Sequence, residues 1–203
     1  MILGALISVM NPLGTVPVFV GLTNEYSVPD RNRIVFWSSF NVLIILLISF
    51  FAGKFILVFF GIKLTSLKIA GGLIIALSGF ALLTGEFAKH KGMKKEKVKD
   101  DIKTRSDIAL TPLAIPMIAG PGTISLLITY NQEYQELQSV FIILGAIVLS
   151  AIIIYVVLKS SFVIVRALGA SGINALSRII GFIVIAIGVE FIVSAIKNVF
   201  NVA

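Results

Sequence analysis

The sequence contains no cysteine and a single histidine, His90, among its 203 residues. Without cysteine the chain has no thiolate nucleophile and no zinc–thiolate site, and one imidazole rules out a multi-histidine metal centre within one chain. Charged residues are also scarce: they make up 13% of the chain, about half the share found in an ordinary soluble domain. We therefore expect no metal and no cofactor, and no group of residues favours an enzyme.

Apolar residues are abundant, at 58% of the chain, and the mean hydropathy is +1.05. A soluble globule of this size cannot bury so much apolar surface. One membrane-spanning helix needs about 20 apolar residues, so the composition accommodates roughly six spans. Helices satisfy their own backbone polar groups in lipid, and the apolar runs are too continuous for a β-barrel. These features predict an all-α membrane protein with one transmembrane domain over residues 1–203.

Six apolar runs can be traced along the chain. The expected spans cover residues 1–23, 34–51 with a continuation to about 60, 69–86, 108–130, 140–158 and 179–200. The first lacks the basic region and cleavage site of a signal peptide, so we expect it to be retained. A connector rich in Gly and Ser, residues 159–177, has the composition of a half-buried amphipathic segment.

The net charge of +7 is concentrated in one loop, residues 88–107, which holds eight of the 17 basic residues. One basic loop in an apolar chain is typical of a cytoplasmic loop and not of a nucleic-acid groove. The links after the first, third and fifth spans hold 13 Lys and Arg residues, and the opposite side holds four. The positive-inside rule predicts an inner-membrane protein with this loop in the cytoplasm and both termini outside it.

The two halves of the chain resemble each other at a nearly constant offset in sequence. Each half, about residues 1–87 and 108–203, holds three spans, so the second half enters the membrane from the opposite side. Inverted three-helix repeats are typical of secondary transporters, whose substrate site lies between the repeats; a purely structural duplication is the alternative. The matching positions are Pro12 with Pro121, Gly14 with Gly122, Thr15 with Thr123, and residues 69–77 with 179–187.

Helix-breaking residues cluster near the middle of the first and fourth spans. The clusters are residues 11–17, Asn-Pro-Leu-Gly-Thr-Val-Pro, and, after Pro112 and Pro116, residues 120–123, Gly-Pro-Gly-Thr. Proline inside a helix costs roughly 3 kcal/mol, and a neighbouring glycine opens further backbone conformations. We expect both helices to be broken by unwound stretches, which in a membrane must line a cavity or be buried in protein. Ordinary proline kinks are the alternative.

An unwound stretch leaves free N–H groups where one half-helix starts and free carbonyls where the other ends. The N–H groups favour an anion and the carbonyls an ammonium group or another cation. This pattern suits a small zwitterion such as an amino acid, although another small anion also fits. The candidate substrate-binding residues are Asn11, Pro12, Gly14, Thr15, Asn41, Gly120, Pro121, Gly122, Thr123 and Ser125.

Three polar groups outside the breaks complete the candidates. Ser38 and Asn41 share one face of the second span, where Asn41 contacts either substrate or another helix. Glu190 lies near the middle of the sixth span. A carboxylate there is expensive, so it is a candidate for proton coupling; pairing with a basic residue or with backbone is the alternative.

At these positions the sequence resembles the MarC family, also called the SnatA family, of multi-pass membrane proteins. The resemblance rests on residues 11–19, on 60–62 with 69–72, on 116 with 120–123, and on 172–176 with 178–181. It implies a small six-span fold, related to the lysine-exporter superfamily, that moves small neutral amino acids such as alanine and glycine in either direction. It also implies that the Asn-Pro-x-Gly and Gly-Pro-Gly-Thr residues form the substrate site.

We therefore expect an alternating-access carrier whose substrate sits between the two broken helices, with protons as a candidate coupling partner. Two alternatives stay open. One is an exporter of another small polar metabolite, and the other is an uncoupled channel for small solutes.

Overall fold

The computed structural model describes residues 2–84, 114 and 118–200, and every secondary-structure element in these residues is a helix. The charged loop at 88–107 and the prolines at 112 and 116 lie outside the described residues, as does His90. The helices are α1 (Ile2–Met10), α2 (Pro12–Thr23), α3 (Val28–Phe60), α4 (Leu64–Thr84), α8 (Pro121–Glu133), α9 (Leu137–Lys159) and α10 (Ser161–Phe200).

Five stretches of the described chain are long and apolar enough to cross a membrane. They are Ile2–Thr23, Val28–Phe60, Leu64–Thr84, Leu137–Lys159 and Ser171–Phe200, and they correspond to the first, second, third, fifth and sixth expected spans. The prediction of a helical membrane protein is therefore confirmed. Of the fourth expected span, the structure describes α8 and a few residues before it.

Helix α3 begins earlier than we expected. The Ser27 hydroxyl oxygen caps it by accepting a hydrogen bond from the N–H of Asp30, and Gly61, with φ of 64°, ends it. The charged residues at 30–33 lie inside this helix, although a sequence reading places them in a polar break. With 33 residues, α3 is about 50 Å long at 1.5 Å per residue, so it exceeds the hydrocarbon core and carries these charges at its end.

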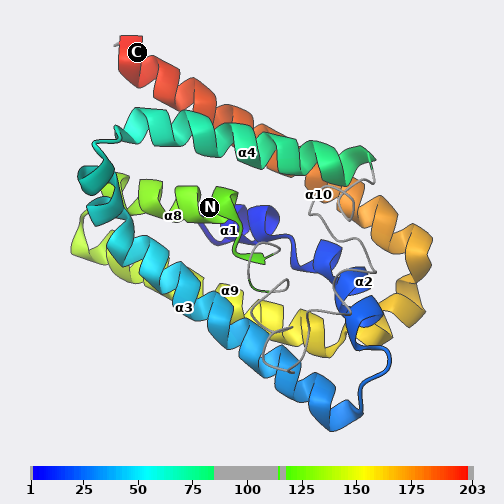
Figure 1. Ribbon diagram of the computed structural model, residues 1–203. Coiled ribbons are helices and arrows are strands. Elements are labelled where there is room, and N and C mark those ends of the chain that lie inside the picture. The colour runs from blue at the N-terminus through cyan, green and yellow to red at the C-terminus, as the bar shows by residue number, and fades with distance from the viewer. Residues whose placement is uncertain (1, 85–113, 115–117, 201–203) are drawn as a thin grey trace.

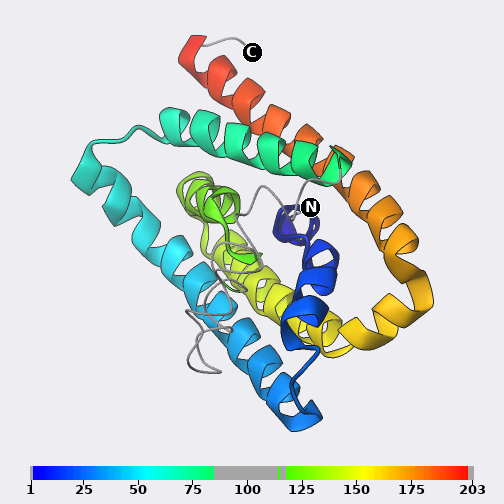
Figure 2. The ribbon, with the colours of Figure 1, turned by 45° about the vertical axis from the view of Figure 1, so that its right-hand side comes forward.

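The long helices form two pairs that diverge as a V (Figures 1 and 2). Helix α4 packs along α10, and α3 packs along α9. The short helices α1, α2 and α8 lie between the two arms: α8 contacts α3 and α4, while α1 and α2 contact α9 and α10. The interrupted helices therefore occupy the centre of the molecule.

Glycines bring α4 and α10 into backbone contact. A β-carbon on Gly79 would lie 2.7 Å from the carbonyl oxygen of Gly181, and one on Gly72 would lie 2.6 Å from that of Gly188. Ala76, between the two α4 glycines, is buried. The small-residue face of the third span thus packs against the sixth span, as close helix packing in membranes requires.

Helix α10 includes most of the connector that separates the fifth and sixth spans. It is helical from Ser161 and is interrupted at Gly169, where φ is 62° and ψ is 177°. The stretch that is apolar enough to span begins at Ser171, eight residues before the expected start. Glycine permits this backbone conformation, which other residues rarely adopt.

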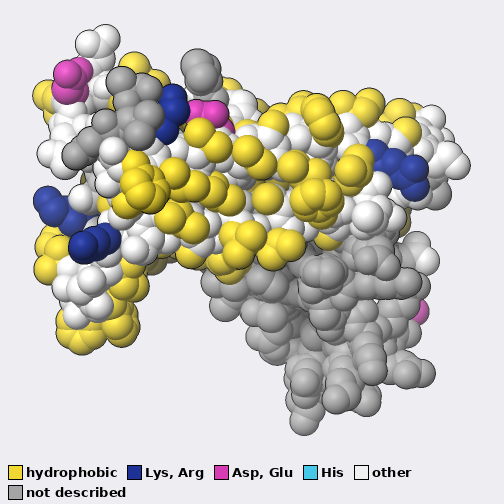
Figure 3. Space-filling model, turned by 90° about the horizontal axis from the view of Figure 1, so that it is seen from above, with side chains coloured by type: hydrophobic (Ala, Val, Ile, Leu, Met, Phe, Trp, Pro, Cys, Tyr) yellow, Lys and Arg dark blue, Asp and Glu magenta, His cyan; other side chains and the backbone are white. Residues whose placement is uncertain are grey.

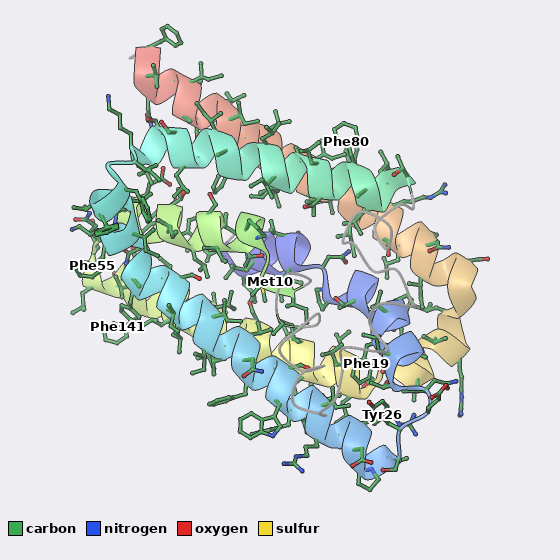
Figure 4. All side chains as sticks on the ribbon, in the orientation of Figure 1. Met10, Phe19, Tyr26, Phe55, Phe80 and Phe141 are labelled. Atoms are coloured by element: carbon green, nitrogen blue, oxygen red, sulfur yellow. The ribbon has the colours of Figure 1, made fainter. Side chains whose placement is uncertain are left out.

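Apolar side chains lie on both the inside and the outside of the molecule. Met10 is buried at the centre, whereas Phe55, Phe80 and Phe141 point outward and are 74%, 52% and 64% exposed (Figure 4). Hydrophobic side chains also cover most of the described face in Figure 3, with Lys and Arg mainly toward its ends. So large an apolar surface suits lipid and not water.

Candidate functional site

The first helix is interrupted at a single residue, Asn11, between α1 and α2. Its φ of 43° and ψ of 66° are left-handed, and it is the one non-glycine residue with positive φ in the described chain. Its side-chain oxygen accepts a hydrogen bond from the N–H of Gly14 at 3.1 Å. Asparagine tolerates this backbone conformation better than most residues and is a favoured helix cap.

This interruption is shorter than the unwound stretch that we expected. Pro12 is the first residue of α2, where its missing N–H removes no helical hydrogen bond. Gly14, Thr15 and Pro17 continue inside α2. The helix therefore restarts at once, and the Thr15 hydroxyl donates to the carbonyl oxygen of Asn11 at 3.1 Å.

The second interruption lies at Ala119 and Gly120. The N–H of Ala119 donates to the carbonyl oxygen of Ala114, five residues back, at 2.9 Å. Gly120 is extended, with φ of −79° and ψ of 172°, and α8 restarts at Pro121. No side chain of the described residues caps this helix start, so, unlike α2, α8 begins with backbone N–H groups that are available to a ligand.

The two interruptions adjoin each other. A β-carbon built on Gly122, in the first turn of α8, would lie 3.7 Å from Cγ1 of Val9 in the last turn of α1. Figures 1 and 2 both show the start of α8 beside α1. The carbonyl end of one half-helix therefore lies close to the N–H end of another.

Most of the predicted site residues near the interruptions are buried. Asn11, Thr15, Thr123 and Ser125 are at most 4% exposed. Pro12, Gly14 and Gly122 are also buried, Gly120 is partly buried, and Pro121 is exposed. The start of α8 is thus the accessible edge of this cluster.

The hydroxyl groups predicted to bind substrate donate to backbone carbonyls in this structure. Thr123 donates to Ile118 at 3.4 Å, and Ser125 donates to Leu67 of α4 at 3.2 Å. Gly71 leaves the space for Ser125, because a β-carbon there would overlap its hydroxyl oxygen. Ser125 therefore joins α8 to α4, and the hydroxyls of Thr15 and Thr123 present only acceptor lone pairs to a ligand.

One donor at the first interruption has no partner. The side-chain nitrogen Nδ2 of Asn11 is buried and makes no hydrogen bond within the described structure. A buried polar group without a partner costs about 1–3 kcal/mol. A ligand that accepts a hydrogen bond from Nδ2 would recover this free energy.

Polar side chains on the neighbouring long helices are also buried. Ser38 on α3, which the sequence analysis names, and Ser150 on α9 are 0% exposed, and neither hydroxyl has a partner in the described chain. Asn41 is half-buried. The hydroxyls of Ser39 and Thr129 are likewise buried without a partner in the described chain, and no pattern in the sequence distinguished these two residues.

Glu190 does not group with the buried residues of the interruptions. It lies on the exposed surface of α10, whereas Asn11, Thr15 and Thr123 are buried in the centre. The carboxylate predicted to couple protons therefore lies on the surface of the molecule, apart from the candidate substrate site.

An ion pair that the sequence analysis missed joins the two halves of the chain. Nζ of Lys68, near the start of α4, lies 2.5 Å from Oε1 of Glu133, the last residue of α8. The side chains are 5% and 33% exposed, and the Lys68 nitrogen lies 5.8 Å from the centre of the Phe191 ring. This pair holds the end of α8 against α4 and α10.

Comparison with known proteins gives a consistent result along the chain. The family model described as MarC family integral membrane protein matches residues 1–200. UPF0056 membrane protein YhcE of Escherichia coli strain K12 is 36% identical over 195 residues, which are 96% of this chain and 90% of the relative. UPF0056 inner membrane protein MarC of E. coli strain SMS-3-5 is 36% identical over 205 residues, covering 96% and 91%. A UPF0056 membrane protein of Buchnera aphidicola subsp. Baizongia pistaciae is 36% identical over 194 residues, covering 95% and 89%. No solved structure matches the chain.

Proposed function

The chain belongs to the MarC family of integral membrane proteins, and from this premise we propose that it is a secondary transporter of small neutral amino acids. Alanine and glycine are the proposed substrates, moved by alternating access in the inner membrane. The relatives named as inner membrane proteins support this location.

The observation that carries the proposal is the contact between the two interruptions at Val9 and Gly122. The end of α1 presents backbone carbonyls, which attract an ammonium group. The start of α8 presents backbone N–H groups without a side-chain cap, which attract a carboxylate. A small α-amino acid carries both charges a few ångströms apart, so it matches two opposite half-helix ends that adjoin.

Asn11 adds a directed donor to this arrangement. Its Oδ1 is occupied by the N–H of Gly14, which leaves its buried Nδ2 for the substrate. We assign Nδ2 to a carboxylate oxygen of the amino acid. The surrounding small and buried residues favour a compact substrate such as alanine or glycine.

The helix contacts support an inverted repeat. Helix α8 corresponds to α2 in this repeat: α3 packs on α8 as α9 packs on α2, and α4 packs on α8 as α10 packs on α2. In the register that matches 69–77 with 179–187, Gly181 and Gly188 correspond to positions 71 and 78. The contacts of Gly72 with Gly188 and of Gly79 with Gly181 are then each other's images to within one residue, as a two-fold axis between the repeats requires.

The same correspondence suggests how the transporter alternates. Lys68 and Glu133 join α4 of the first half to α8 of the second on the side opposite the basic loop. The counterpart of Lys68 is Arg178, since each directly precedes its matched segment. The counterpart of Glu133 is Glu25, which follows Thr15 at the same spacing as Glu133 follows Thr123.

We propose that Lys68 and Glu133 close the outer side and that Arg178 and Glu25 close the cytoplasmic side in the opposite state. Glu25 already has an interaction in this structure. Closing the cytoplasmic side would therefore replace that interaction of Glu25 with one to Arg178. Closing one side while the other opens is what alternating access requires of the two repeats.

The test is uptake of labelled small amino acids by proteoliposomes, with and without a pH gradient. Saturable counterflow of alanine or glycine supports the proposal, and no saturable movement of any amino acid in the panel rejects this substrate class. A conductance that does not saturate favours the channel alternative. In the pH-gradient arm, an unchanged pH dependence in Glu190→Gln rejects proton coupling through this carboxylate.

A further inference from the structure

Two opposite charges lie on the outer surface of the membrane-spanning helices. Lys54 of α3 and Glu190 of α10 are both exposed, and neither forms an ion pair or a hydrogen bond with a described residue. Both are surrounded by apolar side chains that suit lipid. Charged groups inside a span normally face protein or pair with each other, because lipid does not solvate them.

The two residues lie at the same depth. Lys54 is six residues before Phe60, the end of α3, which is about 9 Å along the helix at 1.5 Å per residue. Gly188 packs against Gly72. Gly72 is eight residues after Leu64, the start of α4, which lies on the same side as the end of α3. Gly72 is therefore about 12 Å from that helix end. Glu190 lies two residues closer to that side than Gly188, so it too is about 9 Å from the helix ends.

The surroundings of both residues are apolar, and the two charges are opposite. Lys54 borders an open groove with a volume of about 640 Å³, which is otherwise lined by apolar residues: Phe55, Ile56, Val58, Phe59 and Phe60. Glu190 stands on a helix face with exposed apolar neighbours, Val189, Val193 and Ile196. An apolar groove that contains one ammonium group thus matches an apolar helix face that contains one carboxylate.

The two groups belong to different arms of the V in Figures 1 and 2. We propose that Lys54 of one copy pairs with Glu190 of a second copy, with α10 of the second copy seated in the groove at the end of α3. The patch on α3 differs from the patch on α10, so the contact is head-to-tail; repeated around an axis along the membrane normal, such a contact forms a ring if its rotation closes. This interface does not depend on the proposed transport activity.

Cysteine cross-linking in native membranes tests the proposal without background, because the chain has no cysteine of its own. Lys54→Cys and Glu190→Cys are placed on separate copies with different affinity tags, co-expressed and oxidised. We expect a covalent dimer that carries both tags, at about tenfold higher yield than with a control partner. The control is Ile142→Cys, on the exposed face of α9 at a similar depth. Equal yields for the two pairs, or no cross-linked dimer, overturns the proposal.

Charge exchange gives an independent readout of the same contact. In lipid nanodiscs we expect Lys54→Glu and Glu190→Lys each to reduce the oligomeric fraction about tenfold, which the variant with both changes restores. Lys54→Gln and Glu190→Gln serve where a reversal prevents folding, and each should reduce that fraction in the same direction. Loss in the single variants without restoration in the double variant rejects the ion pair. Oligomers that depend only on anionic lipid and on Lys54 assign the groove to a lipid headgroup instead.

Discussion

Val9 and Gly122 are neighbours at the point where two interrupted helices meet: a β-carbon on Gly122 would lie 3.7 Å from Cγ1 of Val9. They belong to different halves of a chain whose halves resemble each other in sequence. The contact places a carbonyl end beside an uncapped N–H end, at the accessible edge of a cluster of buried residues. The dielectric is low on the buried side of this cluster, so the two half-helix ends interact more strongly with a charged ligand there than they would in water.

Gly122 is the first position to test. A β-carbon there would also lie 2.8 Å from Cγ1 of Ile75, so Gly122→Ala must displace a packed side chain. We expect a loss of about 1–3 kcal/mol in stability and a raised KM for alanine, measured by thermal unfolding and by counterflow. Gly145→Ala on α9, where the new methyl group meets nothing within 4 Å, is the matched control and should change neither.

Two substitutions of Asn11 distinguish its role in capping α2 from its proposed role in binding substrate. Asn11→Asp keeps the oxygen that caps α2 but replaces the unpartnered Nδ2 donor with an acceptor. We expect Asn11→Asp to insert, to lose some stability because its carboxyl group is buried, and to bind alanine at least tenfold more weakly. Asn11→Ala also removes the cap, which costs about 1 kcal/mol in addition. Wild-type alanine affinity in a folded Asn11→Asp variant would remove Nδ2 from the site.

The glycine contacts of α4 and α10 have a structural role. At Gly79 the nearest atom to a new β-carbon is the backbone oxygen of Gly181, at 2.7 Å, which no rotamer change can move. Gly79→Ala should therefore separate the helices and lower the unfolding free energy by about 1–3 kcal/mol. Gly21→Ala, in open space on α2, should have little effect. Unfolding in detergent measures both, and equal stability of the two variants would contradict this packing.

Removing one partner of the Lys68–Glu133 ion pair is expected to lower the stability more than replacing both partners. Glu133→Gln leaves a buried ammonium group without its counter-ion, at a cost of about 1–3 kcal/mol, less than for a fully buried pair because the carboxylate is partly exposed. The double variant Lys68→Met with Glu133→Leu should recover much of this loss. Thermal unfolding decides: additive losses in the double variant would show that the residues act separately.

Local features of the sequence identified the two interruptions. Asn-Pro at 11–12 and Gly-Pro at 120–121 interrupt a helix through their local backbone geometry, whatever the helix packs against. The positions of the two interruptions could therefore be predicted from the sequence. Their extent could not be predicted, because it depends on the cap that Asn11 supplies to its own helix. Gly72 and Gly79, seven residues apart on one face, likewise indicate a close helix contact but not which helix provides it.

Features that depend on distant residues could not be predicted in the same way. Lys68 and Glu133 are 65 residues apart, and only the fold brings them together. Glu190 shows the reverse case: its position in the middle of an apolar run was evident, but the direction it faces depends on how α10 packs against α4. The start of α3 at Val28 was missed because its first turns carry charges beyond the apolar core.

The most direct test of substrate recognition is competition against labelled-alanine counterflow by two analogues that each lack one charge. Propionate keeps the carboxylate and alaninamide keeps the ammonium group. If opposite half-helix ends hold a zwitterion, unlabelled alanine competes at least a hundredfold better than either analogue, since each analogue leaves one end without its partner. Propionate competing as well as alanine would contradict this recognition and indicate a simple anion site.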